Sequence, residues 1–238
     1  MQEEIFRFSR NDKTSEVHII QEKLLCSPEA ARLAVRRITQ DNTGKNTPGL
    51  DGVKSLGVRQ RWNLAENLDG NSSPRVWIPK PGTREKRPLG IPTLKDRAKQ
   101  ALVKLALEPE WEALFEPNSY GFRPGRSTQD ARKQIKNCLV AGEKEIYDAD
   151  IAKCLQCINH HCLLKKLTQG AKSKIYLQIK AWLQAGIMEN GYITQSELGT
   201  PQGGVISPLL ANIALHGLET RVKNAVKTQS GKKRVPMS

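Results

Sequence analysis

The stretch from Lys144 to Ala152 is the feature that most restricts how this chain can fold. Its pattern predicts a β-strand, and the two-residue repeat of a strand places Asp148 and Asp150 on one face. Carboxylates held on a strand and aimed at one side can ligate hard divalent cations, as two-metal phosphoryl transfer requires. Two aspartates on a strand are also common on exposed faces, so spacing alone leaves both interpretations open.

Helices are expected on both sides of this strand. The apolar patterns predict them at residues 19–40, 95–115, 127–141, 159–168, 173–186 and 207–226. Ser27-Pro28 divides the first one, either as a new helix start or as a kink. Pro109 is a candidate interruption of the second. Ser127 is a good N-cap for the third, with Asp130 at the capping-box position.

Short hairpins complete the expected elements. Residues 74–93 predict two short strands, RVWI and RPLGI, joined by a Pro-Gly turn. Asn190-Gly191 is a strong hairpin signal. Residues 42–52 are rich in Gly, Asn, Thr and Pro and are expected to form a loop. Helices, hairpins and one acidic strand together predict an α+β fold.

The charge balance favours a polyanionic partner. The chain has 38 Lys and Arg against 24 Asp and Glu, a formal net charge of +14. Nucleic acid is favoured over an anionic membrane because no amphipathic or lipidation motif is present. No apolar stretch could span a bilayer and the N-terminus has no signal-peptide pattern. Five cysteines are not typical of a disulfide framework, so we expect a reducing, cytoplasmic location.

A glycine-rich segment, LGTPQGGVISPL at residues 198–209, is a candidate nucleotide site. Adjacent glycines allow a backbone to approach a ligand closely, and Ser207-Pro208 begins a helix whose first amides favour phosphate. Gln202 could hydrogen-bond a nucleotide. An ordinary glycine turn before a helix is the alternative.

The hairpin around residue 80 is basic. Nine Lys and Arg lie between Arg75 and Lys104, against only Glu85 and Asp96. Lys80 and Arg87 flank the turn, where they could hold a triphosphate or template phosphates. A solvated charged face is the alternative, but the interleaved apolar residues favour a structured basic surface.

Four segments in this order resemble the reverse-transcriptase blocks of group II intron-encoded proteins: residues 74–100, 115–131 (FEPNSYGFRPGRSTQDA), 147–164 (YDADIAKCLQCINHHCLL) and 199–219 (GTPQGGVISPLLANIALHGLE). Residues 34–53 resemble the N-terminal extension that precedes them. The resemblance implies the fingers and an incomplete palm of a right-hand polymerase. It divides the chain into an extension that contacts template or RNA (1–60), fingers (61–142) and partial palm (143–238).

The resemblance also implies roles for single residues. Asp150 matches the catalytic, metal-binding aspartate, and the Ile151 carbonyl would be a second contact to Mg²⁺. The positions that match dNTP-binding residues are Lys80, Arg87, Leu155 and Gln202. The expected nucleic-acid contacts are Lys45, Arg75, Arg123 and Arg126. The implied partners are group II intron RNA, an RNA template with its DNA primer, and dNTP.

Departures from the family pattern limit the expected activity. The family usually shows Phe-Phe-Asp-x-Ile where this chain has residues 154–158, CLQCI. Leu155 therefore stands at the aromatic position that excludes a ribose 2′-hydroxyl, and Gln156 removes a carboxylate. The Tyr-Ala-Asp-Asp motif does not occur in the chain. We expect a truncated enzyme that polymerises little or not at all alone, with a complementing downstream polypeptide or a dimer left open.

Other hypotheses remain beside the polymerase. Cys154, Cys157, His160 and Cys162 have ligand types suited to zinc, although zinc motifs usually bring two separated ligand pairs. An intron-RNA-binding, maturase-like remnant without catalysis is the main alternative. A decayed fragment whose half sheet exposes an unpaired edge is the third.

Overall fold

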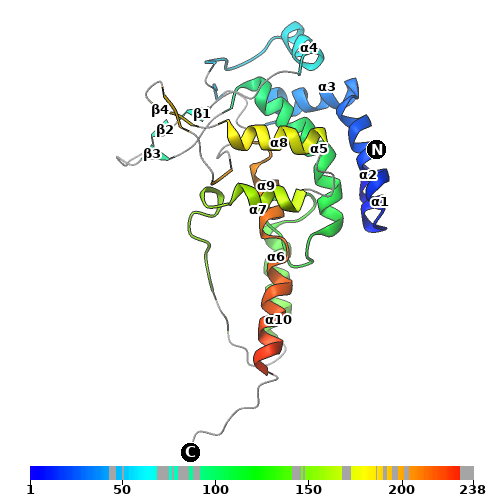
Figure 1. Ribbon diagram of the computed structural model, residues 1–238, viewed down its shortest axis with the longest axis vertical. Coiled ribbons are helices and arrows are strands. Elements are labelled where there is room, and N and C mark those ends of the chain that lie inside the picture. The colour runs from blue at the N-terminus through cyan, green and yellow to red at the C-terminus, as the bar shows by residue number, and fades with distance from the viewer. Residues whose placement is uncertain are drawn as a thin grey trace, which may run out of the picture.

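The computed structural model describes the side chains of residues 1–42, 47–49, 51–68, 92–140, 146, 148–167, 173–185, 198–200 and 204–225. It describes the backbone alone of residues 75–76, 78–79, 86–87, 187–189, 192–194 and 226–230. A helical body makes up most of the molecule, and its strands lie at the side away from the N-terminus (Figure 1). Helices α6 (Thr128–Leu139) and α10 (Leu218–Ser230) project from one end of this body (Figure 1).

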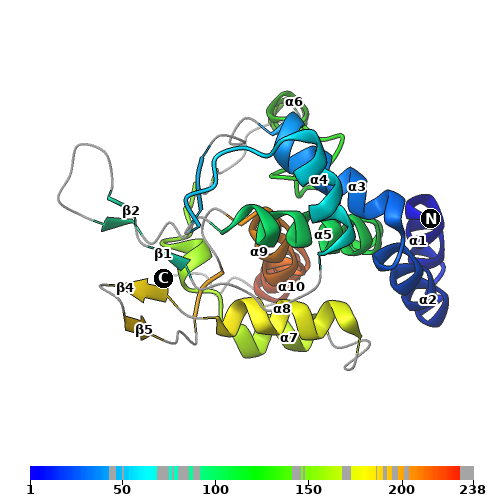
Figure 2. The ribbon, with the colours of Figure 1, turned by 90° about the horizontal axis from the view of Figure 1, so that it is seen from above.

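Helix α5 (Leu94–Leu114) is the centre of the body. It begins at Thr93, whose side chain accepts a hydrogen bond from the Asp96 amide at 3.1 Å. Helices α1 (Gln2–Arg10), α2 (Thr14–Leu25) and α3 (Pro28–Arg36) pack against it, as Figure 2 shows from above. Thirteen of its 21 residues are buried, which is the pattern of a helix covered on several sides.

Pro109 lies inside α5 without ending it. Proline has no amide hydrogen, so the carbonyl of Leu105, four residues earlier, loses its helical donor. The side chain of Gln2 in α1 donates to that carbonyl oxygen at 2.8 Å. Gln21 in α2 donates to the next carbonyl, that of Ala106, at 3.2 Å. The expected interruption at Pro109 does not occur because the packed helices supply the missing donor.

Helix α3 begins where the sequence indicates, whereas α2 begins five residues before the predicted start at residue 19 and α1 was not predicted. The Ser27 hydroxyl accepts a hydrogen bond from the Ala30 amide at 3.2 Å, and Pro28 is the first residue of α3. Ser27-Pro28 is therefore a helix start and not a kink. Helix α3 ends in a π-helical turn, η1 (Arg37–Asp41), and α4 (Val58–Glu66) packs beside it. The described residues of the predicted loop at 42–52 form no helix or strand, which confirms that part of the prediction.

A second group of helices extends the core. Helices α7 (His160–Leu167), α8 (Lys174–Gln184) and α9 (Ser207–Leu215) bury Ile179, Leu183 and Leu210, which join the same apolar cluster as α5. The two helices predicted at 159–168 and 173–186 are confirmed. Helix α6 begins with the predicted capping box, in which Ser127 and Asp130 bond each other's backbone amides.

The strands are short. Strands β4 (Ile187–Glu189) and β5 (Tyr192–Thr194) form the predicted antiparallel hairpin; Asn190 and Gly191 themselves lie outside the described residues. Strands β2 (Ile78–Pro79) and β3 (Lys86–Arg87) are also antiparallel. Within the expected RVWI strand, β1 (Arg75–Val76) pairs in parallel with β4, over a hundred residues away, and Ile78 pairs with β3; Trp77 lies outside the described residues. The pairing of β1 with β4 depends on tertiary structure, and the local pattern does not predict it.

Two expectations about the second half of the chain are wrong. Residues 207–226 do not form one helix: α9 ends at Leu215, and Gly217, with φ +93°, turns the chain into α10. The described residues of the predicted strand, Ile146 and Asp148 to Ala152, form no strand. A strand persists only when neighbours complete its backbone hydrogen bonds, and no described strand pairs with this segment.

In the described part of the chain, no helix combines the length and the apolar character needed to cross a membrane.

Candidate nucleotide and metal site

Asp150 lies on an exposed, irregular segment. Residues 148–153 are all exposed, and Lys153 has φ +51°, a left-handed backbone conformation. A 3₁₀ turn, η2 (Cys154–Gln156), follows directly. Asp150 therefore presents its carboxylate to solvent a few residues ahead of Leu155, which is half-buried and packs on the core.

The turn that carries Leu155 is joined to the start of the glycine-rich segment. The Thr200 amide donates to the Leu155 carbonyl at 2.8 Å, and the Gly199 amide donates to the Ile158 carbonyl at 2.8 Å. Asn159 and Leu198 form an antiparallel bridge beside them. We call residues 155–160 and 198–200 the loop clip. It brings two sequence-predicted motifs, over forty residues apart, into direct contact.

A histidine closes the loop clip. The Asn159 carboxamide oxygen accepts from the Cys162 amide at 3.0 Å and so caps α7. His160, the first residue of α7, has its ring Nε2 2.6 Å from the Gly199 carbonyl oxygen. A carbonyl oxygen only accepts, so Nε2 carries the hydrogen in this contact. Both polar groups of Gly199 are therefore bonded: its amide donates to the Ile158 carbonyl, and its carbonyl accepts from the His160 side chain.

Gly199 is required by this geometry. Its φ is +87°, which side-chain-bearing residues rarely adopt, and an added Cβ would lie 2.9 Å from the Gln156 carbonyl oxygen. Thr200 follows; its hydroxyl is buried and has no hydrogen-bond partner among the described residues. Gln202, the predicted nucleotide contact, lies outside the described residues. The segment resumes at a buried Gly204 and enters α9.

The loop at residues 42–52 is anchored to α5. The Arg97 guanidinium donates to the Thr47 carbonyl at 2.8 Å. Gly49 lies so close to Pro92 that a Cβ there would be 2.6 Å from the Pro92 carbonyl oxygen. Burial lowers the pKa of Arg97, and the charge of Asp51 opposes that shift. Lys45, the predicted nucleic-acid contact of this loop, lies outside the described residues.

Arg123 is a structural residue of its loop. Its side chain is 3% exposed and forms an ion pair with Glu112 through Nε and Nη2. Its Nη1 donates to the carbonyls of Glu116 at 2.9 Å and Ser119 at 2.8 Å, and the guanidinium stacks on Phe115. The prediction placed Arg123 near a template, but in this structure its donors are used within the chain.

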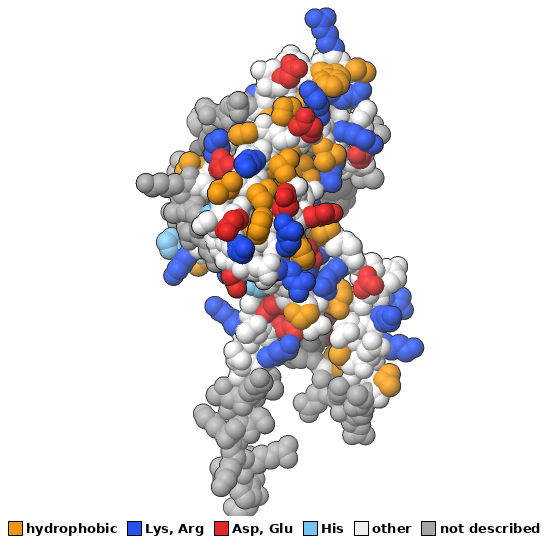
Figure 3. Space-filling model, turned by 90° about the vertical axis from the view of Figure 1, so that its right-hand side faces the viewer, with side chains coloured by type: hydrophobic (Ala, Val, Ile, Leu, Met, Phe, Trp, Pro, Cys, Tyr) orange, Lys and Arg blue, Asp and Glu red, His pale blue; other side chains and the backbone are white. Residues whose placement is uncertain are grey.

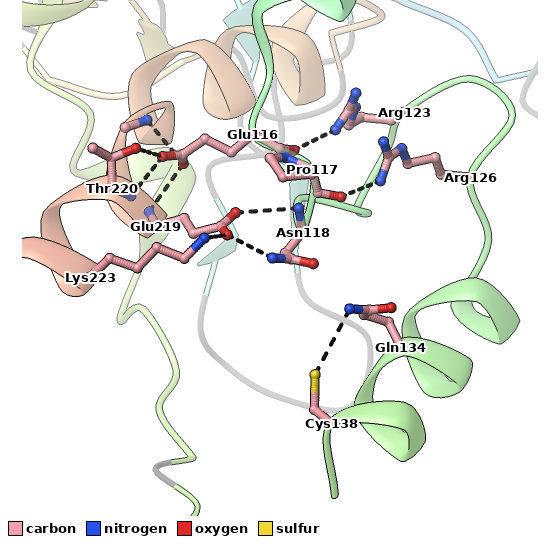
Figure 4. Close-up of polar contacts among 11 residues, drawn as sticks. Glu116, Pro117, Asn118, Arg123, Arg126, Gln134, Cys138, Glu219, Thr220 and Lys223 are labelled. Carbon is pink, nitrogen blue, oxygen red and sulfur yellow. Dashed lines mark hydrogen bonds and ion pairs between the residues drawn. The ribbon is translucent and has the colours of Figure 1, made fainter. Parts of the chain in front are cut away.

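Arg126 is more accessible than Arg123. It is half-buried and donates to the Pro117 carbonyl at 2.5 Å (Figure 4). Its guanidinium also lies over the Tyr120 ring. Among the other predicted contacts, Arg75 and Arg87 are described by backbone alone, in β1 and β3. Lys80 lies outside the described residues.

Two charged side chains fix the junction between α9 and α10. Lys166 in α7 donates to the carbonyls of Ile213, Ala214 and His216, at 3.2, 2.8 and 2.6 Å. Glu116 accepts from the amides of the first turn of α10 and from a hydroxyl (Figure 4). These donors are the amides of Gly217, Glu219 and Thr220 and the Thr220 hydroxyl. They lower the pKa of Glu116 to about 2, led by the Thr220 hydroxyl.

The described residues do not build a complete metal centre. No group of three or more His, Cys, Asp or Glu among them could hold a metal ion. Cys154, Cys157, His160 and Cys162, the zinc hypothesis, all belong to the described part, and His160 directs Nε2 at Gly199. Asp150 is an exposed carboxylate that lacks such neighbours in this part of the chain.

Sequence inspection missed the residues that hold the site together. The sequence alone suggests a zinc ligand at His160 and no anchoring role for Gly199, Lys166 or Glu116. A signal was available for His160, since it follows a good N-cap residue, Asn159, and so occupies a helix's first turn. Glu116 and Lys166 act on backbone groups 47 to 104 residues away, which local patterns do not show.

Comparison with known proteins identifies the family. The family model described as reverse transcriptase (RNA-dependent DNA polymerase) matches residues 78–234, and that described as the N-terminal domain of reverse transcriptase matches residues 1–68. The chain therefore belongs to the reverse transcriptase family, which implies the reverse-transcriptase fold. The described part of that fold is mostly helical. The family generally uses divalent metal ions.

Individual relatives refine this assignment. The chain is similar to Protein YkfC of Escherichia coli (strain K12), with 35% identity over 82% of the chain and 54% of the relative. It is 34% identical to group II intron-encoded protein LtrA of Lactococcus lactis subsp. cremoris, over 90% of the chain and 37% of the relative. Maturase-like protein 1 of Euglena gracilis is 31% identical, over 95% of the chain and 50% of the relative. The resemblance to group II intron-encoded reverse transcriptases is confirmed, and the chain spans about half or less of each relative.

Proposed function

We propose that this chain contributes the dNTP-binding and template-binding part of a group II intron RNA-directed DNA polymerase. The observation that carries the proposal is the loop clip, which joins the turn after Asp150 to the segment leading to Gln202. A polymerase must hold a metal-binding carboxylate and nucleotide contacts in fixed relation, because positioning supplies most of the catalysis of phosphoryl transfer. The division into extension (1–60), fingers (61–142) and palm (143–238) belongs to this proposal.

Mg²⁺ is the proposed metal ion. Asp150 and the Ile151 carbonyl offer hard oxygen ligands, which Mg²⁺ prefers. Two ligands are far fewer than the roughly six oxygens that Mg²⁺ takes, so the described residues alone do not fit a complete site. The remaining carboxylates would come from a Tyr-Ala-Asp-Asp strand, which is not in these 238 residues.

The proposed macromolecular partner is RNA, both as template and as intron. The net charge of +14 supports a polyanion. Helix α6 projects from the body (Figure 1) and exposes Arg132, Lys133 and Lys136. Figure 3 shows Lys and Arg side chains spread over the described surface of the face it draws. Arg126 lies just before this helix. Binding that weakens steeply with salt is expected, because phosphate contacts release counterions.

Primer extension tests the polymerase directly. The purified chain is assayed on an RNA template with DNA primer, dNTP and Mg²⁺, alone and together with a polypeptide that carries the Tyr-Ala-Asp-Asp strand. We expect extension only in the mixture, and loss of it in Asp150→Ala by a factor of about a thousand or more. Asp148→Ala is the matched control, an exposed carboxylate two residues away that should retain most of the activity.

The outcomes separate the proposals. Extension that is unchanged in Asp150→Ala would exclude this aspartate as a metal ligand. Salt-sensitive RNA binding without extension in any mixture would favour the non-catalytic, maturase-like alternative. Primer extension by the chain alone would show that its own carboxylates are sufficient for polymerisation without a Tyr-Ala-Asp-Asp strand.

A further inference from the structure

We propose that His160 is a positioning residue, which sets the spacing between the Leu155 turn and the segment leading to Gln202. By this proposal His160 affects two properties of the site: its affinity for a nucleoside triphosphate and its preference between deoxyribose and ribose. The nucleotide part rests on the proposed function. The mechanical part, that His160 holds the two segments together, rests on the contacts alone.

The geometry points to His160 because it supplies the one side-chain bond described between the two halves of the loop clip. The two amide bonds, from Gly199 to Ile158 and from Thr200 to Leu155, join backbone to backbone. The His160 ring adds a third bond at 2.6 Å, to the opposite polar group of Gly199. Because the amide and the carbonyl of Gly199 are both engaged, a shift along the turn or a rotation about its φ would break at least one of these bonds.

Steric constraint reinforces the hydrogen bonds. Gly199 packs so closely on Gln156 that a Cβ added there would lie 2.9 Å from the carbonyl oxygen of Gln156. Thr200, next in the chain, is 3% exposed, and its buried hydroxyl meets no partner in the described part of the chain. An unpartnered buried hydroxyl is costly, and this one lies one residue before Pro201 in the segment that leads to Gln202. The held segment therefore leads directly to the proposed nucleotide contact.

Leu155 gives the spacing a functional meaning. It stands where the family has an aromatic side chain, it is half-buried, and its own carbonyl belongs to the loop clip. A leucine fills less space over a sugar than an aromatic ring does. Discrimination against ribonucleotides would then depend on how closely the opposite segment approaches, and His160 controls that approach.

Amide hydrogen exchange tests the mechanical part without any activity. His160→Ala should speed exchange of the Gly199 and Thr200 amides by roughly tenfold, as loss of one half-buried hydrogen bond allows. Amides of α5 should not change. His160→Gln, whose side-chain amide can still donate to the Gly199 carbonyl, should restore most of the protection. His161→Ala is the matched control, since the neighbouring histidine is exposed.

Kinetics of the complemented enzyme test the functional part. His160→Ala should raise KM for dNTP several-fold with a smaller change in kcat, and should alter the ratio of dNTP to NTP incorporation. His160→Gln should recover both values. Faster exchange with unchanged KM and unchanged sugar preference would show a purely structural bond and overturn the proposal.

Failure of the proposed function would look different. If no mixture extends a primer, the nucleotide role of His160 falls with the polymerase, while the exchange rates still decide whether His160 holds Gly199. Exchange at Gly199 that is identical in wild type and His160→Ala would overturn the mechanical part, whatever the enzyme does.

Discussion

Helix α5 and the loop clip are stabilised by different forces. In α5, thirteen of 21 side chains are buried, and α1, α2, α3 and α9 pack on the helix. In the loop clip only three of nine residues, Ile158, Gly199 and Thr200, are buried, and the contacts described between the two segments are a few hydrogen bonds. Burial of apolar area contributes far more free energy than exposed or half-buried hydrogen bonds. The body therefore carries the stability, and the candidate site is held on it by specific, weaker contacts.

The largest expected effect is in the body. Leu105→Ala should lower the free energy of unfolding by about 3 kcal/mol, because Leu105 is 2% exposed and its loss leaves a cavity. Urea unfolding measures the change. Leu139→Ala on α6 removes the same atoms from a side chain that is 42% exposed and should cost less than about 0.5 kcal/mol. Equal losses would contradict the division between body and surface helix.

The next effect concerns the loop clip. Gly199→Ala should cost about 2 kcal/mol, from the left-handed backbone and the contact of Cβ with the Gln156 carbonyl. Gly125→Ala separates the two causes, because Gly125 also has a left-handed backbone, with φ +68°, but has open space around it. This variant should lower the free energy of unfolding by about 1 kcal/mol. Amide exchange at residues 198–200 should rise only in Gly199→Ala. A larger cost at Gly125 would sink the steric argument.

A smaller, pH-dependent effect is expected at the α10 junction. The pKa of Glu116 falls from 4.5 to about 2 on folding, so the stabilisation is complete above about pH 4.5 and is lost as pH falls toward 2. Protonation removes the charge that four donors face, and α10 should open first. Exchange of α10 amides between pH 5 and pH 2.5 measures this. Glu116→Gln should weaken that pH dependence, and an unchanged pH profile in that variant would refute the assignment.

The smallest effect should stabilise the protein. Thr200→Val replaces a buried hydroxyl that has no partner in the described part with a methyl group of the same shape. We expect a gain of about 0.5 kcal/mol in the free energy of unfolding. If the Thr200 hydroxyl contacts nucleotide, the same variant should also raise KM for dNTP. A destabilised Thr200→Val protein would show that the hydroxyl has a partner in the folded chain.

Local signals in the sequence predicted many element boundaries. Ser27-Pro28 and the Ser127–Asp130 box begin helices as expected, because capping depends on residues only a few positions apart. Asn190-Gly191 indicated the β4–β5 hairpin for a similar local reason. The strand at Asp148 and Asp150 was wrong for the described residues, because strand formation requires a partner that the local pattern cannot supply.

The candidate site was predictable by residue type but not by arrangement. Asp150, Leu155 and the glycine-rich segment were identified from motifs, and Lys45, Lys80 and Gln202 remain predictions outside the described residues. Arg123 was expected to face a template, but Glu112 and two carbonyls use its donors. An arginine in a loop has the same sequence signature in either role, and only its neighbours decide which one it takes.

By itself, the sequence determined the family, the net charge and those helix and hairpin boundaries that depend on neighbouring residues. Tertiary structure alone decided the rest. The packed chain lets α5 continue past Pro109, where the Gln2 side chain supplies a hydrogen-bond donor. It also pairs β1 with β4 and bonds His160 to Gly199. The reason is physical: backbone groups must be satisfied somewhere, and their partners across long loops are fixed by packing of the whole chain.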